Sequence, residues 1–383
     1  MNKEKRGMKH QISYSSLLIF LLLPLAFLSC KKESWKPGRP LAKEKIRIGV
    51  VHTTDPFSEN SGYSYAHQIG IEEMKNNLGL EDSQILYKIH VDEADLISIE
   101  NAQRELIAQG ANIIFATSFG YMDTCEKLAL EFPSIVFANI NGYKYNDTNF
   151  TNYFGRSYQA LYLCGITAGM KTKSNKLGFV AAQGTENSEV TGNINAFALG
   201  VEMVNPQARI YVKVTHSWFD PMGEMLASRA LIAEGCDVIA QHCNSPTPQI
   251  EAEKAGVWGI GYNTDMGADA PAAVITSAIK RWSPCYTFLV QSVIDGTFTT
   301  IPWGGSLKDG VVDIVPMNKS IPLKEETVRI VEEERRRIES GAFDVFSGVM
   351  ETNNGKTIGM EGKNLSDDEI RNGMNWYYRT IVE

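Results

Sequence analysis

The chain has 383 residues, of which 43% are hydrophobic and 10% aromatic. At roughly 100–200 residues per domain, this length predicts two domains with their own cores, and the composition excludes a largely disordered chain. The formal net charge of −8 argues against a nucleic-acid-binding protein, because such proteins usually carry basic surfaces.

The N-terminus has the pattern of an export signal. A basic stretch over residues 1–10 precedes the apolar run Leu17–Leu28, which is shorter than the roughly 20 residues that a membrane span needs. The following Ser29-Cys30 resembles a bacterial lipoprotein signal, in which Cys30 would receive lipid and become the mature N-terminus. An ordinary cleaved secretory signal with an incidental cysteine is the alternative.

We therefore expect a signal peptide over residues 1–29, a charged, flexible tether over 30–45, and lipid anchoring to a bacterial membrane. The protein would face the periplasm or the extracellular side. Residues 1–29 carry a net charge of +3, which leaves −11 for the remainder.

Strands and helices alternate from Ile46 onward. The expected strands cover residues 46–51, 85–91, 112–117 and 135–139. The expected helices cover a segment ending near residue 76, then 96–109 and 122–131. This alternation predicts parallel βαβ units, with helices on both faces of a sheet.

The same pattern then occurs a second time. Three segments recur in the same order at nearly constant offsets of 122 to 130 residues. The matched pairs are 49–70 with 178–200, 106–114 with 231–239, and 135–137 with 257–259. Two lobes of one α/β design are predicted, because this period is far too long for a solenoid repeat.

The cysteines give little sign of a disulfide framework. Lipidation of Cys30 would leave five cysteines, an odd number, and their spacing matches no zinc signature. We expect them to be small buried apolar side chains, with one disulfide as the alternative.

Two facing lobes suggest a ligand cleft, because ligands of open parallel sheets bind beyond the carboxyl ends of the strands. The segments expected there are rich in aromatic and amide side chains, which suit a flat ligand with polar edges. For any single ring, core packing is the alternative.

Catalytic and metal-binding motifs are weak. No H-E-x-x-H, G-x-S-x-G or Walker A pattern occurs. Asp265, His216 and His242 could act as acid or base, but their spacing does not favour catalysis. We interpret Ser366-Asp-Asp-Glu as a helix start with a capping box and expect no metal site there. The expectation is a binding protein without cofactor or enzymatic activity.

From Ile46 to about Asn318 the chain resembles the basic membrane protein family of ABC-transporter substrate-binding lipoproteins, in the manner of its purine nucleoside receptors. The segments that carry the resemblance are Phe115–Asp123, Gly165–Lys173, Asn195–Gly200, Ser217–Pro221, Ala240–Pro246, Gly261–Met266 and Trp303–Gly310. The tail that ends Gly373-Met-Asn-Trp-Tyr377 is similar to the subgroup close to purine-base binders.

The resemblance implies a periplasmic-binding-protein type I fold: two Rossmann-like lobes with parallel sheets, joined by a hinge. We expect the N-terminal lobe to comprise residues 46–157 and 277–304, and the C-terminal lobe 158–276 and 305–383. The helix expected at about 325–340 carries charges that we interpret as a solvated face with spaced Glu–Arg pairs; a permease contact is the alternative.

The resemblance also assigns binding residues. Tyr63 keeps the ring of the family's first loop, whereas Asn60 and Asn244 replace two acids; Asp265 and Lys280 retain the charged positions. The rings expected to stack on the ligand are Tyr63, Phe119 and Trp218, with Trp282 as a further candidate. The expected readers of its edge are Asn60, Asn244, Asp265 and Lys280.

Exchanging carboxylates for amides favours a ligand whose edge offers acceptors as well as donors. We expect a purine base or nucleoside that the receptor delivers to ABC permease subunits. A flavin such as riboflavin is the second candidate, and a nucleoside-processing enzyme or a ligand sensor is the alternative from another class. No nucleic acid polymer is expected as a partner.

Overall fold

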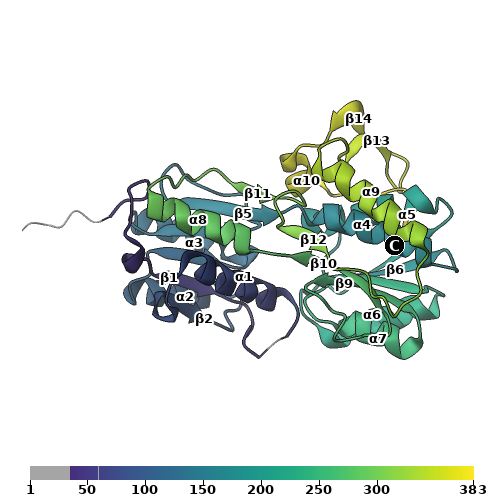
Figure 1. Cartoon of the computed structure of the whole chain (residues 1–383), viewed down its shortest axis with the longest axis horizontal. Coiled ribbons are helices and arrows are strands. Elements are labelled where there is room, and N and C mark those ends of the chain that lie inside the picture. Colours follow the sequence, from purple (N-terminus) through teal and green to yellow (C-terminus); the bar gives the residue numbers. More distant parts are fainter. Residues whose placement is uncertain (1–34, 59) are drawn as a thin grey trace, which may run out of the picture. The chain divides into compact units, whose positions relative to one another are not determined.

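The computed structural model describes residues 35–58 and 60–383. The expected signal peptide and Cys30 lie outside the described residues. Within the described part of the chain, the strands form two large sheets and one hairpin (Figure 1). No helix of this part is long and apolar enough to cross a membrane.

The first sheet is wholly parallel. Its strands, from edge to edge, are β11 (Trp303–Gly305), β5 (Phe150–Gly155), β4 (Val136–Ile140), β3 (Ile113–Ala116), β1 (Ile48–Val51) and β2 (Ile85–Lys88). The helices of this lobe are α1 (Tyr63–Leu78), α2 (Leu96–Ala108), α3 (Met122–Glu131) and α8 (Ser283–Asp295). Separate clusters of buried side chains lie against its two faces, as expected for a sheet covered on both sides.

The second sheet repeats this order. Its strands are β12 (Val312–Ile314), β10 (Val274–Lys280), β9 (Trp258–Asn263), β8 (Val238–His242), β6 (Lys176–Ala181), β7 (Arg209–Val214) and β15 (Ile381–Val382). Only β12 runs antiparallel among the pairs of this sheet. Its helices are α4 (Ser157–Lys171), α5 (Ser188–Val204), α6 (Pro221–Ala233), α7 (Thr247–Ala255) and α9 (Glu325–Glu339). The order β5-β4-β3-β1-β2 thus recurs as β10-β9-β8-β6-β7.

The duplication extends to the packing of single atoms. A Cβ atom added to Gly49 would lie 2.7 Å from Ile114 Cδ1 and 3.0 Å from Leu106 Cβ. At the repeated position Gly178, it would lie 2.8 Å from Ile239 Cδ1 and 3.0 Å from Leu231 Cβ. Both strands need glycine because a helix leucine packs directly on the backbone. The predicted fold class of two α/β lobes is confirmed.

Three further elements lie between α9 and β15 in the chain. They are the hairpin β13 (Ser347–Glu351) and β14 (Thr357–Asn364), and the short helix α10 (Asp367–Gly373). Ser366 and Glu369 form the predicted capping box of α10, since each side chain hydrogen-bonds the backbone of the other. Short 3₁₀ turns occur at Lys43–Lys45, Asp82–Gln84 and Phe119–Tyr121.

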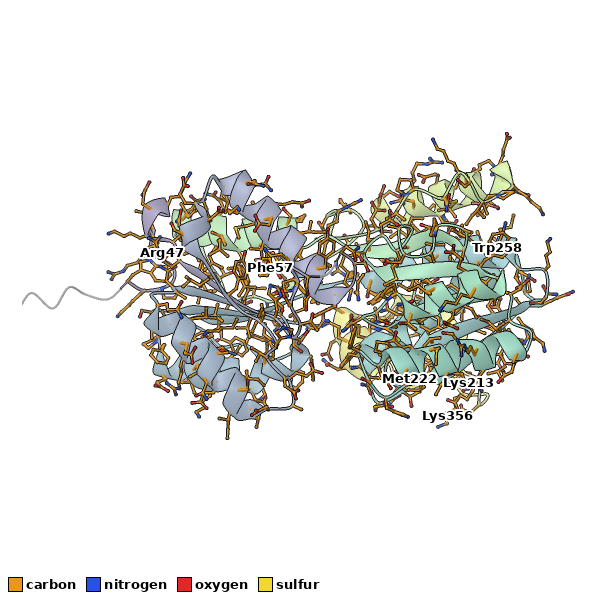
Figure 2. The ribbon with its side chains drawn as sticks, turned by 90° about the horizontal axis from the view of Figure 1, so that it is seen from below. Arg47, Phe57, Lys213, Met222, Trp258 and Lys356 are labelled. Carbon is orange, nitrogen blue, oxygen red and sulfur yellow. The ribbon has the colours of Figure 1, made fainter. Side chains whose placement is uncertain are left out.

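The chain passes between the lobes after β5, after β10 and after β11. Arg47 and Phe57 lie in the first lobe, whereas Lys213, Met222 and Trp258 lie in the second (Figure 2). The expected second passage was near Ser277, but β10 continues in the second sheet to Lys280. The strand extends further because it pairs with β12 on its outer side through Lys280.

The five described cysteines are buried and free. Burial raises the pKa of each thiol, so none has the lowered pKa of a reactive thiolate.

Candidate functional site

A cavity of about 630 Å³ lies between the lobes, where the carboxyl ends of both sheets face each other. Its walls come from the loops after β1 to β4 and after β6 to β8, from the last residues of β5, β9 and β10, and from α1, α4, α5 and α10. The size falls within the roughly 300–1,000 Å³ of typical small-molecule sites.

Several residues with left-handed backbone conformations lie at or next to this cavity. His90, Asn141 and Asn263 have positive φ angles of 55°, 55° and 68°, and all line the wall. His216, with φ 54°, precedes the lining residue Ser217. The repeat pairs His90 with His216 and Asn141 with Asn263. Such conformations cost free energy in non-glycine residues and cluster at functional sites, so both lobes hold matched strained corners toward the cleft.

An ion pair between buried Lys280 and partly buried Glu189 belongs to one wall. Lys280 Nζ lies 2.8 Å from Glu189 Oε1, and Glu189 Oε2 accepts a hydrogen bond of 2.7 Å from Asn141 Nδ2. Burial disfavours the charged form of both groups, but the attraction between the two opposite charges is larger. The pKa of Lys280 is therefore raised and the pKa of Glu189 is lowered. Both groups are therefore charged at neutral pH. Because Asn141 belongs to the first lobe and Glu189 to the second, this contact joins the lobes.

In contrast to this charged pair, His242 is an uncharged side chain. Its ring lies 4.3 Å from that of Tyr262 and 5.8 Å from that of Trp218, measured between centroids. Neither ring nitrogen has a hydrogen-bond partner, and burial lowers the pKa to about 4. The neutral ring therefore offers one donor and one acceptor. Asn263 Oδ1 is also buried without a partner, while its Nδ2 donates to Asn244 Oδ1 over 3.2 Å.

Unmet polar atoms of this kind are costly in a folded protein unless a ligand or water satisfies them. His242 and Asn263 both line the cavity. The residues that carry these unmet donors and acceptors therefore stand in the cavity wall.

Aromatic rings lie around these polar groups. Phe119 and Tyr143, with centroids 6.4 Å apart, line the first-lobe wall and are 47% and 52% exposed. Trp218 and Phe219 line the second-lobe wall. Rings so exposed inside a cavity offer faces on which a flat ligand can stack.

The structure brings together five of the eight side chains singled out from the sequence. The lining residues among them are Tyr63, Phe119, Trp218, Asn244 and Lys280. Asn60 and Asp265 are exposed outside the lining, and Asp265 Oδ1 accepts a hydrogen bond from Gly267 N. Trp282 is fully buried behind the wall, stacked on His67 at 4.9 Å. A role in ligand binding stays a prediction for all eight.

Further lining residues stand outside these eight. His242, Tyr262 and Asn263 belong to the strand ends where the sequence predicts the cleft, whereas Asn141, Glu189, Asn193 and Arg371 were not singled out. The repeat signals one pair, because Asn141 and Asn263 are 122 residues apart, like the segments 135–137 and 257–259. Glu189 belongs to the first turn of α5 and Arg371 to the C-terminal α10, both away from the strand ends.

The fold is that of a two-lobed α/β protein with a cavity of small-molecule size between the lobes. Residues 47–344 match the model of the family described as ABC transporter substrate-binding protein, PnrA-like, and the chain belongs to this family. The predicted resemblance is thus confirmed.

Two relatives and one solved structure illustrate the range of this likeness. A purine-binding protein of Brucella abortus is 32% identical over 89% of this chain and 94% of its own length. TsgA13 of Haloferax volcanii, which carries the name of a glucose-binding protein of an ABC transporter, is 33% identical over 82% of this chain and 78% of its own. An ABC-transporter solute-binding protein from Conexibacter woesei superimposes with a TM-score of 0.64 at 20% identity, over 78% of this chain and 98% of its own. This last similarity concerns the fold.

Proposed function

We propose that the protein is a lipid-anchored, extracytoplasmic receptor that captures a purine base or nucleoside in the interlobe cavity and delivers it to an ABC permease. The observation that carries the ligand class is the pair His242 and Asn263. Their unmet donor and acceptor atoms lie among aromatic rings, which is the arrangement needed to read the edge of a flat heterocycle while its faces stack. The purine-binding relative supports the same choice.

The proposed mechanism is binding without chemistry. Asn141 Nδ2 and Glu189 Oε2 join the lobes on one side of the cleft, and Gly62 N donates to Thr264 Oγ1 over 2.8 Å at another point. A ligand that touches both walls adds contacts to the closed arrangement alone, so it shifts the open–closed equilibrium toward closure. The permease would then recognise the closed receptor.

Calorimetric titration tests the ligand class. The panel is adenine, guanosine, hypoxanthine and riboflavin, with glucose included because of the name of the Haloferax relative. We expect one of the purines to bind with a dissociation constant below about 100 μM, or roughly −5.5 kcal/mol. Binding of glucose or riboflavin alone would reject the purine assignment, and an inert panel would reject the heterocycle class.

An enzyme and a receptor are separated by incubation with nucleosides. A receptor returns each nucleoside intact, whereas a nucleoside-processing enzyme releases free base, which chromatography detects. A sensor would act with a signalling protein instead of a permease, so neighbouring genes for permease and ATPase subunits support transport.

The anchor is tested separately from the ligand. The Cys30→Ser variant should lose incorporation of labelled fatty acid and leave the membrane fraction. If the unchanged protein takes up no label, the lipid anchor is rejected, whatever the receptor binds.

A further inference from the structure

The C-terminal segment 365–383 is fixed to the second lobe. Strand β15 pairs with β7, and the Tyr378 backbone N–H donates to Asn195 Oδ1 of α5 over 2.8 Å. Met374 is fully buried, and a Cβ on Gly192 of α5 would lie 3.5 Å from Met374 Cγ. The segment therefore moves with the second lobe, and it lies beyond residues 47–344 of the family match.

One side chain of this segment reaches the first lobe. Arg371 Nη2 donates to the carbonyl oxygen of Gly142, between β4 and β5, and to Asn152 Oδ1 of β5 over 3.2 Å. Its guanidinium carbon lies 3.9 Å from the centroid of the Phe154 ring, also in β5. A flat guanidinium over a ring that also donates to two oxygen acceptors is a contact that lysine would not reproduce in full, because its ammonium cannot stack.

The contact leads directly to the polar centre of the cavity. Gly142 follows Asn141, whose strained backbone aims its amide at Glu189, and Glu189 in turn holds Lys280. Gly142 also lies close against Asn139 of β4, since an added Cβ would lie 2.2 Å from Asn139 Oδ1. Arg371 therefore holds the corner that carries Asn141.

A second contact lies beside it at the first passage between the lobes. Arg156, just after β5, forms hydrogen bonds of 2.9 and 2.6 Å with the carboxylate of Asp367 in α10. It also donates to the carbonyl oxygen of Gly304 in β11 over 3.2 Å. The α10 helix thus reaches from the second lobe to β5 through Arg371 and, through Asp367, to Arg156 just after β5.

We propose that Arg371 is a positioning residue and an interlobe clasp: it holds the Asn141–Gly142 corner against α10 and thereby stabilises the closed cleft before and during ligand binding. The ligand part of this inference rests on the proposed function, but the clasp itself does not. Its role is to keep Asn141 in hydrogen-bonding reach of Glu189.

The test compares Arg371→Ala with Arg379→Ala. Arg379 belongs to the same C-terminal segment, but among the described residues it has no ion pair with the first lobe. Its ion-pair partners are Glu202 in α5 and Glu351 in β13. Small-angle X-ray scattering of the ligand-free proteins should give a larger radius of gyration for Arg371→Ala than for the unchanged protein and for Arg379→Ala. With a purine that binds, the dissociation constant should rise roughly tenfold or more, as for a lost charge-assisted hydrogen bond.

Equal scattering from the two variants would overturn the clasp, even if Arg371→Ala binds ligand weakly, because that result describes a ligand contact only. If Arg371→Ala does not fold, Arg371→Lys replaces it, since lysine keeps the charge but loses the flat contact with Phe154. If no purine binds the unchanged protein, the proposed ligand is rejected while the scattering comparison still decides on the clasp.

Discussion

At the scale of single residues, Gly62 is a position where the lobes approach each other tightly. Its φ is 99°, and a Cβ atom would lie 2.6 Å from the carbonyl oxygen of Asn244 in the second lobe. Both the backbone conformation and the space exclude any other residue. The glycine is therefore part of closure, although it has no side chain to contact a ligand.

We predict that Gly62→Ala weakens ligand binding by about tenfold or more, because the added methyl holds the first-lobe loop away from Asn244. Gly110→Ala is the matched control: its φ is 96°, but nothing lies within 4 Å of its added Cβ. Titration of both variants with the same ligand checks this. Equal losses would mean that backbone strain alone is responsible and that the lobes do not close on this residue.

His242 makes stability depend on pH. Its folded pKa of about 4 lies below the ordinary 6.5, so the unfolded chain binds more protons between these values. The free energy of unfolding therefore rises with pH in this window and falls on acidification, by at most about 1.4 kcal/mol per pH unit for this group. His52, also lowered to about 4 by burial, adds in the same direction.

We predict that His242→Gln removes one such contribution, so its stability falls less steeply than that of the unchanged protein from pH 6.5 to 4. Urea denaturation at a series of pH values measures the difference. Parallel curves would show that the pKa of His242 is the same in the folded and the unfolded state.

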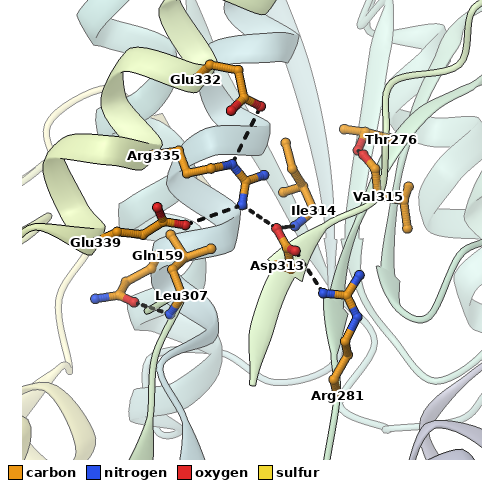
Figure 3. Close-up of polar contacts among 10 residues, drawn as sticks. All are labelled: Gln159, Thr276, Arg281, Leu307, Asp313, Ile314, Val315, Glu332, Arg335 and Glu339. Atoms are coloured by element: carbon orange, nitrogen blue, oxygen red, sulfur yellow. Dashed lines mark hydrogen bonds and ion pairs between the residues drawn. The ribbon is translucent and has the colours of Figure 1, made fainter. Parts of the chain in front are cut away.

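At the scale of elements, an ion network connects the interlobe passages with α9. Asp313 of β12 pairs with Arg335 of α9 and, over 2.8 Å, with Arg281 in the passage after β10 (Figure 3). Arg335 also approaches Glu332 and Glu339 of its own helix, at 3.5 and 3.9 Å. The charged helix predicted from the sequence exists. Arg335 is only 17% exposed, so this arginine belongs to a partly buried ion network and not to the solvated face.

We predict that Asp313→Asn lowers the free energy of unfolding by about 2 kcal/mol, because two arginines lose their shared carboxylate. Glu333→Gln is the control, since its pair with Arg329 on α9 is exposed and should contribute at most about 0.5 kcal/mol. Thermal and urea unfolding compare them. Similar values for both variants would show that the network contributes nothing beyond a surface pair.

The order of strands and helices in the two lobes was predictable, because the repeat left a signal in the sequence. Gly49 and Gly178 lie within the buried strands β1 and β6 and recur at the repeat offset together with their leucine partners, so the spacing reveals them. Trp282 was placed in the site because it follows a strand end, but it caps α8 and turns into the core: a Cβ added to Gly70 would touch it. Arg371 was not found, because only the folding back of the C-terminal segment brings it to the cleft.

At the scale of the whole molecule, the two lobes share one backbone design but offer different side chains. In the repeat, Phe119 is equivalent to Asn244, and Tyr63 is equivalent to Asn193. At these positions the first lobe has a ring and the second lobe has an amide. Lys280 and Glu189 add charge to the second wall. Such a cleft distinguishes the two ends of an asymmetric ligand, which fits the binding of one small molecule in one orientation.

On the function proposed above, the polar atoms of His242 read the edge of a purine between the lobes. Calorimetric titration of the unchanged protein and of His242→Phe with the best-binding purine tests it most directly. We predict a dissociation constant below about 100 μM for the unchanged protein and a loss of about tenfold or more for the variant, which keeps the ring but not its hydrogen bonds. Equal affinity of the two proteins, or no binding of any purine, would contradict this account.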